Sequence, residues 1–109
     1  MAKRKLWPPM PTSLMGLAGP IGVEPDDELT KNGLLGSYKN HERVIRIADE
    51  LDPSLAYLVL YHEFIEAALA DSGLQNLIRG KKLKRLKEAF CDAIAVALLA
   101  EFKSRNSLS

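Results

Sequence analysis

The stretch Leu60-Tyr61-His62-Glu63-Phe64-Ile65-Glu66-Ala67 lies inside a long apolar segment and places ionisable side chains there. In a helix, His62 and Glu66 lie on one face because they are four residues apart. A second apolar segment contains Glu88-Ala89-Phe90-Cys91-Asp92, whose first and last residues repeat this spacing. Ionisable side chains between apolar helices are costly to bury unless a partner compensates them. The two segments therefore predict a helix pair with a polar cluster in its seam.

Local sequence signals give the boundaries of both helices. Asp52-Pro53 combines a good N-cap residue with a proline suited to the first helical position, and Gly73 is a natural stop. We therefore expect one helix from Asp52-Pro53 to Gly73. A connector ends at Gly80, and apolar residues at helical spacing then predict a second helix that ends at about Phe102.

The N-terminal half of the chain favours a few short strands. The segment from Met15 to Val23 is apolar but is interrupted by glycines and a proline, and Arg43 to Ala48 alternates as a strand does. Turn residues occur at Pro25-Asp26-Asp27 and at Asn32-Gly33. The predicted class is α+β: a small, irregular antiparallel sheet followed by two packed helices.

The bulk composition is that of one small globular domain. A chain of 109 residues with 47% hydrophobic and 27% charged residues supports a single modest core. We expect a flexible basic and proline-rich arm over residues 1–13, a domain over 14–103 and a frayed tail over 104–109. The single cysteine excludes an internal disulfide, and together with the lack of a signal-peptide pattern it favours a cytoplasmic location.

The order of these segments resembles the minimal zincin-like metallopeptidases of phages and bacterial mobile elements. That family combines a Gly-Tyr segment, a strand, a helix with Leu-His-Glu-x-x-His and a helix that carries a glutamate. The matching pieces here are Gly36-Ser37-Tyr38, Arg43-Val44-Ile45-Arg46-Ile47, Leu60 to Ala67 and Glu88 to Asp92. The resemblance extends over residues 15–102.

The resemblance implies a metal site and assigns a role to each residue. His62 and Glu88 are the expected first and third metal ligands, and Glu63 is the expected general base. Asp92 is expected to accept the ring proton of His62 and fix its orientation. Glu66 stands where the family has its second histidine and is the expected second metal ligand. Zinc accepts carboxylate oxygen, so zinc is the expected divalent cation, although a harder site also suits manganese or iron. Alternatively, this chain has kept the fold and lost the metal.

Two functions stay open at this point. The first is a metal-dependent peptidase acting on a peptide or protein substrate. The second is a non-catalytic phage structural or accessory protein, in which the carboxylates form a buried ion network with a basic residue such as Arg43 or Arg46. The location implied is the bacterial or phage-infected host cell, with the virion as an alternative.

The charge pattern argues against nucleic-acid and membrane partners. The net charge is only +1, so no overall field attracts either of them. No apolar segment reaches membrane-spanning length. Six basic residues lie between Arg79 and Lys87, and we interpret them as the solvated start of a helix, with at most weak, salt-sensitive binding to nucleic acid.

Overall fold

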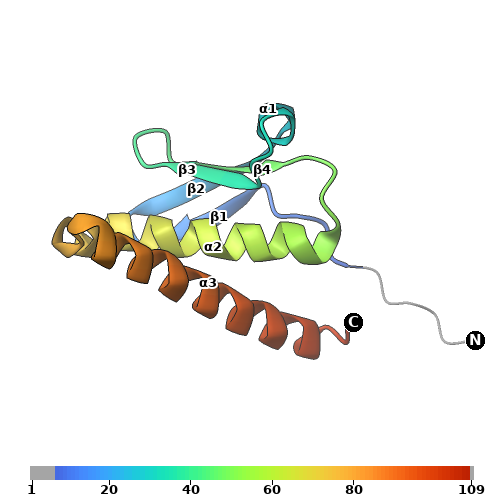
Figure 1. Ribbon diagram of the computed structural model, residues 1–109. Helices are drawn as coiled ribbons and strands as arrows, with labels where there is room; N and C mark the ends of the chain where they lie inside the picture. The colour runs from blue at the N-terminus through green and yellow to red at the C-terminus, as the bar shows by residue number, and fades with distance from the viewer. Residues whose placement is uncertain (1–6, 109) are drawn as a thin grey trace, which may run out of the picture.

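The computed structural model describes residues 7–108 and places a four-stranded sheet against two long helices (Figure 1). The strands are β1 (Ser13–Gly16), β2 (Gly19–Asp26), β3 (Gly36–Lys39) and β4 (Val44–Ala48). The helices are α1 (Asp27–Lys31), α2 (Pro53–Ser72), the 3-10 turn η1 (Leu74–Leu77) and α3 (Gly80–Arg105). The predicted α+β class is confirmed.

The sheet is mixed, with strand order β1-β2-β4-β3. The β1–β2 and β3–β4 pairs are antiparallel, whereas β2 and β4 run parallel, with Val23 opposite Ile45. The prediction of a wholly antiparallel sheet is therefore wrong at this pair. The chain between β2 and β4 passes through α1 and β3, so it re-enters the sheet in the same direction. This arrangement leaves β3 at one edge.

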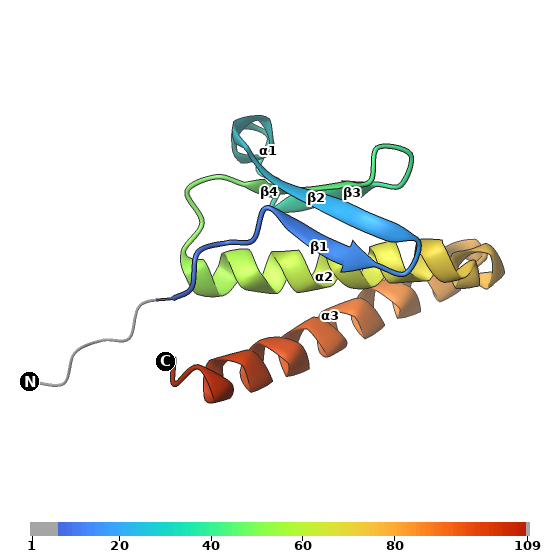
Figure 2. The ribbon, with the colours of Figure 1, turned by 180° about the vertical axis from the view of Figure 1, so that it is seen from behind.

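The sheet, α2 and α3 form three successive layers (Figures 1 and 2). Helix α2 lies in the middle and contacts both neighbours, which explains why it is apolar on nearly all sides. The alternation predicted for β4 is confirmed, since Ile45 and Ile47 are buried. The core joins residues of every layer: Ile21, Val23, Ile45, Ile47, Tyr57, Val59, Leu60, Ala67 and Leu99.

The ends of α2 are formed as predicted. The side chain of Asp52 accepts a hydrogen bond from the Leu55 backbone nitrogen at 2.7 Å, and Gly73 adopts the left-handed conformation with φ of 78°. Pro25-Asp26-Asp27 is not simply a turn. Its first two residues end β2, and the Asp26 side chain then caps α1, a helix too short to show apolar periodicity.

Trp7 anchors the N-terminal segment to the end of the helix pair. Its ring lies 5.4 Å from that of Tyr57 and 5.9 Å from that of Phe102, measured between centroids. The Tyr57 hydroxyl also donates hydrogen bonds to the carbonyls of Pro8 and Pro9. The predicted flexible arm over residues 1–13 is therefore held in place from Trp7 onward, and its first six residues lie outside the described part of the chain.

Within residues 7–108, no helix combines the length and the apolar character needed to cross a membrane.

Helix α3 continues to Arg105, beyond the predicted domain boundary at residue 103. Its final turn carries Lys103 and Arg105, which interact favourably with the helix dipole there.

Gly36 allows β3 to approach α2 closely. A Cβ atom at Gly36 would overlap Val59 and lie 3.4 Å from the Cγ of Glu63. Gly36→Ala is therefore expected to lower the free energy of unfolding by about 1–3 kcal/mol, measured by urea denaturation. Gly22→Ala is the matched control, since its nearest neighbour would be Val44 at 3.6 Å. An equal loss in both variants would contradict this close-approach explanation.

Candidate metal site between the two long helices

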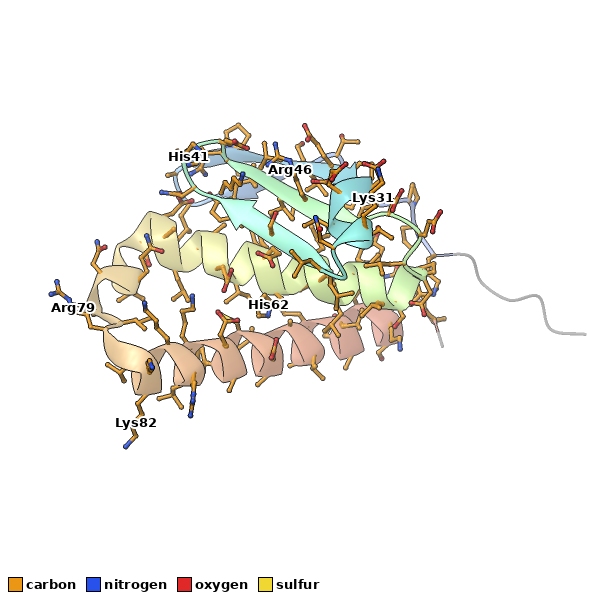
Figure 3. The ribbon with its side chains drawn as sticks, turned by 45° about the horizontal axis from the view of Figure 1, so that its top comes forward. Lys31, His41, Arg46, His62, Arg79 and Lys82 are labelled. Atoms are coloured by element: carbon orange, nitrogen blue, oxygen red, sulfur yellow. The ribbon has the colours of Figure 1, made fainter. Side chains whose placement is uncertain are left out.

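His62 points into the seam between α2 and α3, where two carboxylates meet it (Figure 3). Its Nε2 atom lies 3.6 Å from Oε1 of Glu66 and 3.3 Å from Oε2 of Glu88. One potential ligand atom from each residue lies within 4.8 Å of the other two. The predicted meeting of His62 and Glu66 with Glu88 across the seam is confirmed, and this group could hold a metal ion.

Asp92 contacts the other ring nitrogen of His62. The distance from Nδ1 to Oδ1 of Asp92 is 2.7 Å, which makes the contact an ion pair when the imidazole is protonated. A neutral His62 that carries its proton on Nδ1, the nitrogen beside Asp92, directs the lone pair of Nε2 towards two carboxylates. This meeting of a lone pair with carboxylates is unfavourable unless a cation lies between Nε2 and the two carboxylates or the imidazole ring carries a second proton.

Glu63 is the most constrained carboxylate of the site. Glu63 is only 8% exposed. Its Oε2 atom has no hydrogen-bond partner among the described residues. Burial and, next, the negative charge of Glu66 raise the pKa of Glu63 to about 7. A carboxylate with a pKa near neutrality can accept a proton and release it again at physiological pH.

Glu63 and His62 line one groove beside β3. The groove has a volume of about 390 Å³ and also contains Asp92. Its remaining lining is apolar: Gly33, Leu34, Leu35, Gly36, Leu55, Leu58 and Val59. A concave apolar groove with a few convergent polar groups is the usual form of a ligand site.

Glu66 and Glu88 each change the pKa of the other's carboxyl group. Burial and the hydrogen bond to Glu88 raise the pKa of Glu66. Partial burial opposes ionisation of Glu88, but hydrogen bonds from Glu66 and Lys87 outweigh it and hold the pKa of Glu88 below its usual value. The opposite directions of the two shifts mean that Glu66 binds a proton more readily than Glu88 does.

Lys87 is the basic residue of the site, and the sequence interpretation missed it. Its Nζ atom lies 3.4 Å from Oε1 of Glu66 and 3.3 Å from Oε1 of Glu88. The two arginines predicted for this role lie elsewhere. Arg43 pairs with Asp71 at 2.7 Å, and Arg46 pairs with Glu42 at 2.7 Å. They cannot serve the site because both lie on the sheet side of α2, away from the seam with α3.

The sequence contains one indirect indication of the role of Lys87. It ends the run of basic residues, where it directly precedes Glu88 and follows Leu83 by four positions. The solvated face predicted for that run holds for its exposed members but not for Lys87, which is half-buried against Glu66.

The thiol of Cys91 takes no part in this chemistry. The residue is fully buried, and burial, followed by the charge of Glu66, raises the pKa of the thiol to about 11. It is therefore protonated and unreactive at neutral pH.

The arrangement of His62 and two glutamates on α2 and α3 is consistent with a zincin-like site. Comparison of the chain with protein-family models, with curated proteins and with solved structures gave no match.

Proposed function

We propose that this protein is a metal-dependent hydrolase of the minimal zincin type, and that it cleaves a peptide bond in a peptide or protein substrate. The observation that carries the proposal is the pairing of two features in one place. Three potential ligands converge within 4.8 Å at His62, Glu66 and Glu88. Beside them lies the buried Glu63, with a pKa near 7 and an unpartnered oxygen.

The residues of the site fit a divalent cation. Their donor set of one imidazole nitrogen and two carboxylate oxygens is one that zinc accepts, and its hardness also suits manganese or iron. The cluster gathers the carboxylates of Glu63, Glu66, Glu88 and Asp92, whereas Lys87 is the ammonium group in contact with it. A cation held by His62, Glu66 and Glu88 relieves this excess of negative charge.

Each residue has a specific task in the proposed reaction. When bound, the cation supplies Lewis-acid polarisation of the scissile carbonyl and makes water in the site more acidic. Glu63 takes the proton of the attacking water and passes it to the leaving amine. Asp92 holds the imidazole of His62 in the orientation that presents Nε2 to the site. The apolar walls of the groove limit the access of bulk water to Glu63.

Lys87 supports one alternative, a non-catalytic interaction protein. Its ammonium group contacts both Glu66 and Glu88, so it already supplies part of the charge that a metal would bring. In this alternative the His62 ring carries a second proton and the cluster is an ion network that fixes the register of α2 against α3.

Calorimetric titration with zinc, and separately with manganese, tests the proposal on protein previously treated with a chelator. The wild type is expected to bind one cation, and His62→Ala to weaken the affinity at least about tenfold. His41→Ala is the matched control, because His41 is exposed on the loop between β3 and β4. The loaded protein is then incubated with an unfolded protein substrate such as casein.

The alternative predicts a different result in the same experiment. Neither metal is taken up, and His62→Ala lowers the melting temperature, because its loss leaves carboxylates unpaired in the seam. That combination would refute the metal-dependent function. Metal uptake without cleavage of casein or of a peptide library would refute the hydrolytic step alone.

A further inference from the structure

The end of the helix pair that lies farthest from Trp7 carries a second apolar groove, which meets the proposed metal site at Lys87. It has a volume of about 390 Å³ and lies between η1 and the first half of α3. Leu77, Leu86 and Phe90 line it and are 73%, 64% and 58% exposed. Contiguous apolar side chains with this exposure commonly mark an interaction surface. We call this surface the tip groove.

Lys87 lines the tip groove, and the other basic side chains on the same turns of α3, which we call its basic rim, lie beside the groove and do not line it. Lys81, Lys82, Lys84 and Arg85 are exposed on the first turns of α3, and within residues 7–108 none of them has an ion-pair partner. Figure 3 shows Arg79 and Lys82 directed away from the body of the protein at this end. The segment from Arg79 to Lys87 contains no acidic residue that could offset this charge. The tip is therefore strongly basic on a protein whose net charge is only +1.

Apolar lining and a basic rim together define the chemistry of a partner. A partner needs apolar side chains to fill the concavity and negative charges to meet the rim. An amphipathic helix satisfies both, since residues at i, i+4 and i+7 present one apolar stripe while acidic residues occupy its flanks. A lipid surface is flat on this scale and cannot enter a groove. We propose that the tip groove binds an acidic amphipathic helix of another protein.

A synthetic helical peptide provides the test, with leucines at i, i+4 and i+7 spacing and glutamates at its other positions. Its control peptide has the same composition with the leucines scrambled off that spacing. Fluorescence anisotropy with full-length protein is expected to give at least about tenfold tighter binding of the patterned peptide. Binding should weaken as salt is raised, because rim charges are screened.

Two substitutions with matched controls locate the binding surface. Leu86→Asp is expected to weaken peptide binding at least about tenfold, whereas Val96→Asp is not, since Val96 is 56% exposed on the same helix but outside the groove. Lys82→Glu is expected to weaken binding about threefold and to reduce its salt dependence, while Lys39→Glu on β3 should do neither. Lys87 is left unchanged because it also contacts Glu66 and Glu88.

Three outcomes would overturn the proposal. Equal affinity for both peptides would remove the requirement for an apolar stripe. Binding to vesicles of phosphatidylcholine and phosphatidylglycerol without binding to the patterned peptide would assign the surface to anionic lipid. A dimer in analytical ultracentrifugation that Leu86→Asp dissociates would assign it to a second copy of this chain. Because the variants leave His62, Glu66 and Glu88 intact, none of these outcomes bears on metal binding.

Discussion

At about pH 8 and without added metal, Glu63→Gln is expected to raise the free energy of unfolding by on the order of 3 kcal/mol. The reason is the burial of Glu63 beside Glu66, which raises the pKa of the Glu63 carboxyl from 4.5 to about 7. Above its folded-state pKa this carboxylate is charged in a site that disfavours charge. Glutamine has nearly the same shape and removes the charge.

The pH dependence gives this prediction its sign. A pKa that is raised on folding means that the folded protein binds the proton more tightly, so Glu63 favours the folded state below 4.5 and this contribution is lost as the pH rises to about 7. The advantage of Glu63→Gln should therefore be greatest above neutrality and should fade as the pH falls towards 4.5. Urea denaturation across this range measures it.

An exposed carboxylate provides the control for the stability effect. Glu50→Gln changes the same chemical group on the surface, and its free energy of unfolding at about pH 8 should stay within roughly 0.5 kcal/mol of the wild type. If Glu63→Gln stabilises the protein equally at acidic and alkaline pH, buried charge is not the cause and the assignment of a raised pKa is wrong.

The same substitution has the opposite consequence for the proposed activity. With metal bound, Glu63→Gln should retain the cation, because Glu63 is not among the three converging ligands. Hydrolysis should fall by about two orders of magnitude or more, since the group that accepts the proton of the attacking water is lost. A residue whose removal stabilises the fold and abolishes the reaction is under functional constraint, because packing alone would favour its replacement.

The helices and the site geometry were predictable because their signals are local. Asp52-Pro53 and Gly73 determine the two ends of α2 through backbone chemistry that involves only neighbouring residues. The four-residue spacing of His62 and Glu66 likewise fixes their common face. Once α2 and α3 pack, Glu88 and Asp92 can reach His62 from consecutive turns.

What the sequence left open depends on contacts between distant segments. The parallel pairing of β2 with β4 follows from how the chain crosses over between them, and no residue pattern within either strand specifies it. The sequence does not distinguish Lys87 from the exposed lysines, because the basic run is uniform along the chain. Only the packing of α3 on α2 turns that one side chain towards Glu66, whereas Arg43 is held by Asp71.

Glu66→His is expected to strengthen zinc binding at least about tenfold, which corresponds to about 1.4 kcal/mol. Two physical effects act in the same direction. The substitution supplies an imidazole nitrogen, a donor better matched to zinc than carboxylate oxygen, at the position facing Nε2 of His62. It also removes one of the two carboxylates that Lys87 contacts, so the ammonium group is held less firmly in the site. Calorimetric zinc titration of the variant and the wild type measures the gain.

Lys87→Met separates these two effects. Methionine keeps the unbranched shape of the side chain, one atom shorter, and removes its charge, so any gain in zinc affinity reports the loss of competition from the ammonium group. If Lys87→Met matches Glu66→His, competition by Lys87 explains the whole effect, and the identity of the ligand at position 66 matters little. If only Glu66→His gains, the nitrogen donor is responsible. Failure of the wild type and both variants to bind zinc would mean that Lys87 and a protonated His62 hold the carboxylates together as a packing network.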